Sequence, residues 1–340
     1  MRIGLSRRWV IRLGAALAIL VLLLYVAASW KLFDVISHVD AHCGFSPQHQ
    51  ARFATYTPSS FGSEGLPADL AGSVDLGRYE VSDYQDVSLT SRDGVKLAAW
   101  WIPAARADAP VVVMAHGAGS CRKDPVMLLP AGMLHRNGFS VLMVDLRNQG
   151  DSTITDGRFA GGTREYLDVL GAWDWVRARG VPASRIGLFG ESNGASTVVI
   201  AAGAEPMVTA TWEDSGYADT WAAIDEEVAR HGFPQALTFG ARLWGLLYGI
   251  DLDKHRPIDA IASIDQRPLM IVQGTADQRV DPKNAVEFSQ ALDAVRGHPN
   301  PDSLWLVPGA AHVQSAWKEP GEYEHRLAAF FGAALGGTGP

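Results

Sequence analysis

Apolar residues recur along the chain in a pattern that predicts a sheet covered by helices. From residue 110 onward, short continuous apolar runs alternate with longer stretches of helical spacing. Buried strands separated by helices are typical of a mostly parallel sheet with both faces covered. The expected strands lie at 110–117, 139–147, 185–192, 208–215, 268–274 and 303–309, and the expected helices at 125–137, 163–179, from 192, at 282–295 and at 319–334.

An antiparallel hairpin is expected ahead of this sheet. Residues 86–90 and 95–103 read as strands, and the Asp93-Gly94 pair between them is a hairpin turn signal. Residues 31–78 are rich in Ser, Pro, Gly and Gln without a sustained period, which indicates a stalk or an irregular lead-in. The predicted fold class is therefore α/β, a mostly parallel doubly wound sheet with an antiparallel N-terminal hairpin over 79–340.

Residues 216–262 interrupt the alternation of strands and helices. They read as two or three helices broken by Pro234 and several glycines. The favoured interpretation is a helical cap over the C-terminal edge of the sheet, and the alternative is an ordinary long crossover. Aromatic residues of this cap are expected to line an acyl pocket, unless they only pack the cap onto the sheet: Trp221, Phe239, Trp244 and Tyr248.

The N-terminus carries an uncharged apolar run at 13–30, close to the length that a membrane-spanning helix needs. Four arginines precede the run, namely Arg2, Arg7, Arg8 and Arg12. The positive-inside rule then keeps the N-terminus in the cytoplasm and places the remainder outside. A signal anchor over 1–30 is favoured because the run exceeds the usual apolar length of a cleaved signal peptide. Cleavage near 26–29, or export through the twin-arginine-like stretch 6–12, are the alternatives.

Composition and charge narrow the class of protein. A hydrophobic content of 47% in 340 residues is enough for a full core. The formal net charge of −8 becomes −12 once the four N-terminal arginines are set aside. Such a domain should repel nucleic acid, so no nucleic-acid partner is expected.

The chain contains two cysteines, Cys43 and Cys121. Two are too few for a disulfide scaffold, and their spacing matches no metal site. The pattern favours two free thiols, and a single bridge between them is the alternative.

The stretch "LFGESNGAS" at 188–196 is the strongest chemical signal. It places Ser192 in a Gly-x-Ser-x-Gly pattern where a predicted strand runs into a predicted helix, which is the context of a nucleophile elbow. Small residues are needed there because neighbouring backbones approach closely. The helix N-terminus would also favour an oxyanion next to the serine.

A serine nucleophile needs a base and an acid that orients the base. Asp277 and His312 follow the strands at 268–274 and 303–309, at the edge where open α/β sheets build their sites. Asp281 is the competing acid, but it reads as a helix N-cap. Histidines elsewhere after the serine lie in helical or turn stretches: His231, His255, His298 and His325.

The loop "HGAGS" after the strand at 110–117 is expected to supply the second half of an oxyanion hole. The backbone N–H of Ala118 would join that of Asn193 around the oxyanion. His116 in this loop is expected to be a structural residue that supports the loop.

Five motifs occur over residues 80–335, namely "HGAGS", "DLRNQGDS", "GESNG", "GTADQRV" and "GAAH". Taken together, they resemble the α/β-hydrolase superfamily. The resemblance implies triad roles for Ser192, Asp277 and His312. The loop that often reads Asp-x-Arg-Gly-His-Gly-x-Ser in the family has Asn148 and Gln149 instead, which is expected to affect substrate fit.

The expected reaction is ester hydrolysis through an acyl-enzyme on Ser192, without metal or organic cofactor. A lipid-like ester is the expected substrate of a membrane-tethered enzyme with an apolar cap. Serine peptidases, amidases and thioesterases share this triad, although no propeller-like domain precedes the hydrolase, which lowers the case for an oligopeptidase. A surface-anchored binding protein without catalysis is the alternative of another class.

Overall fold

The computed structural model describes residues 7–44 and 46–336. Arg2 and the first residue of the twin-arginine-like stretch lie outside the described residues. The chain divides into two compact units. The smaller unit combines the chain up to His38 with Trp221–Asp251, and the larger unit combines Val39–Thr220 with the chain from Leu252 onward.

The larger unit is built on an eight-stranded sheet in the part of the chain that is described, with the strand order β1-β2-β4-β3-β5-β6-β7-β8. β1 and β2 form an antiparallel hairpin, β2 runs antiparallel to β4, and the strands from β4 to β8 are parallel. This confirms the predicted mostly parallel sheet with an antiparallel N-terminal hairpin. The strands are β1 Gln85–Thr90, β2 Lys96–Ile102, β3 Val111–Ala115, β4 Ser140–Val144, β5 Ile186–Glu191, β6 Ala210–Asp214, β7 Leu269–Gly274 and β8 Leu304–Val307.

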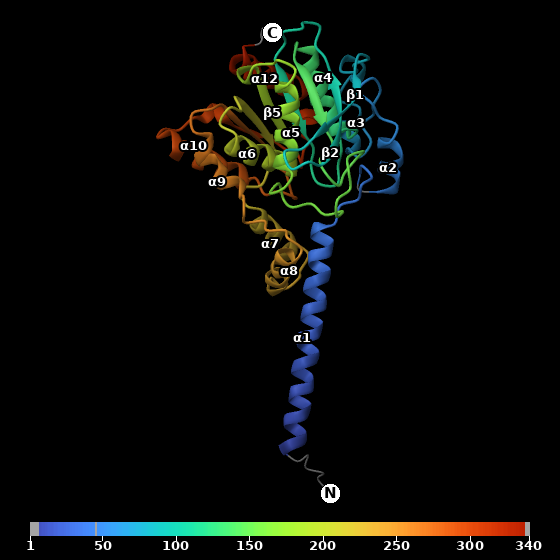
Figure 1. Cartoon of the computed structure of the whole chain (residues 1–340), viewed down its shortest axis with the longest axis vertical. Coiled ribbons are helices and arrows are strands. Elements are labelled where there is room, and N and C mark those ends of the chain that lie inside the picture. Colours follow the sequence, from blue (N-terminus) through green and yellow to red (C-terminus); the bar gives the residue numbers. More distant parts are fainter. Residues whose placement is uncertain (1–6, 45, 337–340) are drawn as a thin grey trace. The chain divides into compact units, whose positions relative to one another are not determined.

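Helices cover both faces of this sheet (Figure 1). Side chains of the central strand β3 alternate between two cores, with Val112 and Met114 in one and Val111 and Val113 in the other. The first core is closed by α4 Pro125–Arg136, α11 Ser315–Lys318 and α12 Pro320–Leu335. The second core is closed by α5 Tyr166–Arg177, α6 Asn193–Ala204, α9 Pro257–Ile264 and α10 Lys283–Arg296. Short 3₁₀ turns precede β5 and β8, at Ala183–Arg185 and Pro301–Ser303.

The lead-in from Val39 onward belongs to the larger unit and is not a free stalk. It contains α2 Pro47–Phe53, α3 Ala68–Ala71 and a 3₁₀ turn at Leu76–Arg78. Its apolar side chains enter the first core, among them Phe53, Tyr56, Phe61 and Leu70. These residues have no regular spacing because they extend from irregular backbone, so a search for periodicity does not reveal their burial.

A disulfide joins Cys43 of the lead-in to Cys121 of the loop after β3, with a Cα–Cα distance of 5.3 Å. The favoured expectation of two free thiols is therefore wrong. The lead-in folds back onto this loop, and the N–H of Gly44 donates a hydrogen bond to the carbonyl of Gly119 at 3.1 Å. That tertiary contact, which the sequence spacing does not reveal, brings the two cysteines together.

The predicted insertion at 216–262 contains α7 Thr220–Arg230, α8 Ala236–Leu247 and α9. α9 packs on α6 and so belongs to the covering of the sheet. α8 instead lies beside α1 Arg7–Ser37 in the smaller unit (Figure 1). α1 is long and apolar enough to cross a membrane. The expectation that this insertion caps the sheet stays a prediction.

Candidate active site

Ser192 occupies a strained turn between β5 and α6. Its backbone angles, φ 54° and ψ −124°, are rarely adopted by residues other than glycine and cost roughly 1–3 kcal/mol. The surrounding sheet holds the turn, since the N–H of Ser192 donates to the carbonyl of Asp214 at 2.8 Å. Strain of this kind persists only where the neighbouring structure enforces it, and it lifts the serine side chain out of the strand.

The two glycines of the motif are required by close approach of backbone. A Cβ on Gly190 would collide with the carbonyl of Gly194. A Cβ on Gly194 would collide with the carbonyl of Ala115 at the end of β3. The Gly-x-Ser-x-Gly pattern therefore packs α6 tightly against both β5 and the neighbouring β3.

The structure brings Ser192, His312 and Asp277 into one hydrogen-bonded chain. Nε2 of His312 lies 2.8 Å from Oγ of Ser192, and Nδ1 of His312 lies 2.8 Å from Oδ2 of Asp277. Asp277 follows β7 and His312 follows β8. The three side chains thus come from loops at the carboxyl ends of three parallel strands, although 120 residues separate the histidine from the serine.

Asp277 is held as a carboxylate. Burial disfavours its charge, but hydrogen bonds from His312 and from the backbone N–H groups of Arg279 and Val280 outweigh burial and lower the pKa of Asp277. Because an ionised carboxylate only accepts hydrogen bonds, Nδ1 of His312 carries the proton. Nε2 is then left with its lone pair toward the hydroxyl of Ser192, as a general base requires.

The loop after β3 lies directly against the serine. A Cβ on Gly117 would be 3.0 Å from Cβ of Ser192 and 3.4 Å from its Oγ. Ala118, the next residue, is half-buried. Asn193 begins α6, so its N–H has no acceptor within the helix. Both backbone N–H groups assigned to the oxyanion hole therefore belong to segments adjacent to Ser192.

His116 is fully buried and supports this loop. Its Nδ1 lies 2.8 Å from the carbonyl of Gly117, and its Nε2 accepts the N–H of Leu146 at 3.0 Å. Burial lowers the pKa of His116, which keeps the imidazole neutral with the proton on Nδ1. Both ring nitrogens are occupied by backbone groups, in agreement with a structural role.

Asn148 and Gln149 hold loops by accepting hydrogen bonds from backbone N–H groups. Both are fully buried. The carboxamide oxygen of Gln149 accepts the N–H of Gly119 at 2.6 Å, and that of Asn148 accepts the N–H of Thr155 at 2.6 Å. The expected effect of these two residues on substrate fit stays a prediction. The competing acid Asp281 accepts the N–H of Lys283 at the start of α10.

Buried carboxyl groups around the nucleophile turn were not anticipated from the sequence. Glu191, Glu213 and Asp214 are fully buried at the ends of β5 and β6. Burial raises the pKa of Asp214 to about 7 and that of Glu213 to about 8, and it raises the pKa of Glu191 well above its usual value. The hydroxyl of Tyr323 donates to Asp214 at 2.8 Å. The sequence signal that could have indicated them is the acidic pair in "WED", which ends an apolar strand. Such a strand is expected to be buried, and buried carboxyl groups are rare.

The residues expected to line an acyl pocket lie in the segment of α7 and α8. Trp221 is buried, whereas Phe239 is 64% exposed. The ring of Tyr248 lies 5.1 Å from that of Phe33 in α1. Trp244 is half-buried on α8. Contact of these side chains with a substrate stays a prediction.

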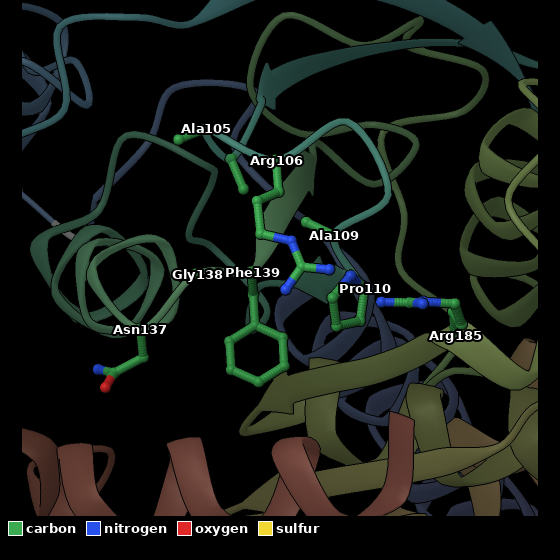
Figure 2. A pocket seen from close by; sticks show the side chains of 9 residues that line it. Ala105, Arg106, Ala109, Pro110, Asn137, Gly138, Phe139 and Arg185 are labelled. Carbon is green, nitrogen blue, oxygen red and sulfur yellow. The ribbon is translucent and has the colours of Figure 1, made fainter. Parts of the chain in front are cut away.

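A separate cavity of about 190 Å³ is lined by Arg106, Pro110, Phe139 and Arg185 among others (Figure 2). Pro110, Phe139 and Arg185 directly precede β3, β4 and β5. The cavity therefore lies at the amino ends of the parallel strands, opposite the edge that carries Ser192. Among the described residues, no group of three or more His, Cys, Asp and Glu side chains is arranged to hold a metal ion.

Comparison with known proteins places this site in a family. The model of the prolyl oligopeptidase family matches residues 131–338. The uncharacterized protein Rv2307c of Mycobacterium tuberculosis is 28% identical over 249 residues, which are 71% of this chain and 77% of that protein. The thiohydrolase aneE of Aspergillus aculeatus is 29% identical over 159 residues, or 44% of this chain and 49% of that protein.

Among solved structures, the Pyrococcus furiosus esterase Pf2001 superposes with a TM-score of 0.58 at 24% sequence identity, over 82% of this chain and all of that one. This likeness supports the α/β-hydrolase fold. The family match covers more than half of the chain and contains Ser192, Asp277 and His312. The chain therefore belongs to the prolyl oligopeptidase family and is a serine hydrolase of the α/β-hydrolase fold.

Proposed function

We propose that this serine hydrolase is a membrane-anchored esterase that cleaves carboxylic esters through an acyl-enzyme on Ser192. The observation that carries the proposal is the continuous hydrogen-bonded chain from Ser192 through His312 to Asp277. Hydrogen bonds in this sequence, from serine to imidazole to carboxylate, let the imidazole accept the serine proton while the carboxylate stabilises the imidazolium that forms.

The steps follow from this arrangement. Oγ of Ser192 attacks the ester carbonyl as Nε2 of His312 takes its proton, and the N–H groups of Ala118 and Asn193 bind the oxyanion. Collapse of the tetrahedral intermediate breaks the bond to the alkoxy group, which leaves as the alcohol with the proton from His312. Water then adds to the acyl-enzyme with His312 again as base, and the carboxylic acid is released.

The anchoring part of the proposal rests on α1 and on the disulfide. The uncharged run 13–30 lies in a helix of 31 residues that is long and apolar enough to span a membrane. A Cys43–Cys121 disulfide is typical of proteins in oxidising compartments, which supports an extracytoplasmic larger unit. Packing of α8 on α1 favours an uncleaved anchor over a cleaved signal peptide. Cleavage near 26–29 would remove Tyr25, whose hydroxyl donates a hydrogen bond to the carbonyl of Ala236 at the start of α8.

The substrate class is tested with matched substrates that share one acyl group. Full-length protein in detergent is assayed on p-nitrophenyl butyrate, a butyryl thioester and butyryl p-nitroanilide. The proposal predicts the highest kcat/KM for the ester. A higher value for the thioester would favour the activity named in the relative aneE, and a higher value for the anilide would favour a peptidase or amidase. Either result would overturn the ester assignment.

Lipid-like esters are the favoured substrates within this class. The support is the proposed position of the enzyme at a membrane, since α1 is long and apolar enough to span one. We expect kcat/KM to rise along a p-nitrophenyl series from acetate to octanoate. A steady fall along this series would contradict the lipid-like assignment and leave esterase activity intact.

A further inference from the structure

Helix α8 exposes an apolar face that no part of the smaller unit covers among the described residues. Phe239, Leu243, Leu246 and Leu247 are 64%, 49%, 51% and 76% exposed. Their spacing places them on one face of a helix. Arg242 is also exposed and borders this face, three residues after Phe239 and four before Leu246, and its guanidinium lies over the ring of Trp221 at 5.6 Å. Four large apolar side chains exposed on one side of a helix are typical of an interaction site.

The opposite face of α8 packs closely on α1. Its buried residues are small, namely Thr238, Gly240, Ala241 and Gly245. A Cβ on Gly240 would lie 2.5 Å from Cβ of Ser29, which shows that the two helices approach as closely as glycine permits. Small residues at a helix contact are typical of helix pairs in membranes. α8 thus presents one face to α1 and leaves the other for a different environment.

The contacts also fix the relative depth of the two helices. The hydroxyl of Tyr25 donates to the carbonyl of Ala236 at 2.8 Å. Further along both helices, Gly240 lies against Ser29, and the ring of Tyr248 lies 5.1 Å from that of Phe33. Residue numbers rise together, so α8 runs parallel to the C-terminal part of α1.

This register places the start of α8 within the apolar run of α1. The run ends at Trp30, and charged residues follow at Lys31 and Asp34, which form an ion pair at 3.1 Å. Tyr25 lies five residues before Trp30, which corresponds to about 7.5 Å along the helix. The exposed residues of α8 follow from this level outward, with Phe239 next to Gly240 at the level of Ser29 and Leu247 next to Tyr248 at the level of Phe33.

We propose that the exposed face of α8 lies at the extracytoplasmic interface of the membrane that α1 spans, with Phe239 at the boundary of the lipid acyl chains and Leu247 at the level of the headgroups. The proposal rests on the proposed anchoring by α1. Phe239, at the level of Ser29, would lie deeper than Leu247, at the level of Phe33. The membrane contact of the protein is then a pair of helices, one of which comes from the chain between β6 and β7.

The test uses full-length protein in phosphatidylcholine–phosphatidylglycerol vesicles. Both native cysteines are bonded to each other, so one added cysteine carries a fluorescent label at one site. Labels are placed by Phe239→Cys and Leu247→Cys on α8, by Leu20→Cys on α1 as the anchoring reference, and by Gln290→Cys on the exposed surface of α10 as the matched control. Quenching is measured with nitroxides attached either near the headgroup or near the end of the acyl chain.

We expect lipid nitroxides to reduce the fluorescence at position 239 roughly twofold relative to the label at 290, with less quenching at 247 than at 239. Quenching at 20 without quenching at 239 and 247 would overturn the membrane role of α8 and leave the anchor intact. Oxidative disulfide crosslinking of two copies through the unlabelled Leu247→Cys variant, without quenching of the labelled variant, would assign the face to a second copy. Absence of quenching at 20 would overturn the anchoring and, with it, the proposal for α8.

Discussion

The disulfide between Cys43 and Cys121 should contribute a large share of the stability of the larger unit. The bridge closes a loop with a sequence separation of 78 residues. Loop-closure entropy for that length corresponds to about 4.5 kcal/mol at room temperature in the chain-entropy model. Since the whole stability of a domain is roughly 5–15 kcal/mol, loss of the bridge should be easy to detect.

The perturbation is the double variant Cys43→Ala/Cys121→Ala, measured by urea unfolding of full-length protein in a mild detergent. With a denaturant dependence of about 3 kcal/mol per molar, the midpoint should fall by about 1.5 M. The single variant Cys43→Ala breaks the same bond and should lose nearly as much as the double variant. A change in midpoint below about 0.3 M would refute the assigned role of the bridge. A loss confined to the double variant would show that packing of Cys121 matters more than the bond.

Three further outcomes follow from the site. Asp277→Asn should lower kcat on p-nitrophenyl butyrate by about 10³–10⁴-fold, since the imidazole loses its preferred tautomer, and an unchanged rate would contradict the assignment of the acid. Asp214 has its folded pKa raised to about 7, so its stabilising contribution is complete below its unfolded pKa near 4 and is lost as pH rises through about 7. Urea midpoints of Asp214→Asn should therefore decline less than those of the wild type between about pH 4 and pH 8, and parallel declines would contradict this. Gly194→Ala forces a Cβ against the carbonyl of Ala115 and should lower the free energy of unfolding by about 3 kcal/mol or more. A urea midpoint equal to that of the wild type would contradict this and show that α6 can shift.

The fold class and the proximity of Ser192, Asp277 and His312 were predictable from the sequence. Both follow from short stretches of sequence whose structural effect has a clear physical cause. Continuous apolar runs identify buried parallel strands, and the carboxyl ends of such strands meet at one edge. Asp277 and His312 could be chosen because they follow two of these strands. The Gly-x-Ser-x-Gly pattern could be read because only glycine avoids the collisions at positions 190 and 194.

Other features depend on tertiary contacts that leave no periodic signal. The lead-in buries Phe53 and Tyr56 from irregular backbone, and its fold back onto the loop after β3 brings Cys43 to Cys121. The strand order, in which β4 lies between β2 and β3, is likewise not visible in the run of strands along the chain. Packing of α8 on α1 joins segments about 200 residues apart, so the aromatic residues of α8 could not be assigned an environment from their spacing.

The proposed chemistry is tested most directly by the rate of p-nitrophenyl butyrate hydrolysis by full-length wild type, Ser192→Ala and the surface control Ser82→Ala. Removal of a triad nucleophile should reduce kcat by about 10⁶-fold, to the background of the assay, while Ser82→Ala retains the wild-type rate. All three proteins should show the same urea midpoint within about 0.5 M, so that a loss of rate reports chemistry. Retention of the wild-type rate by Ser192→Ala would contradict the acyl-enzyme mechanism and the role of the Ser192–His312–Asp277 chain.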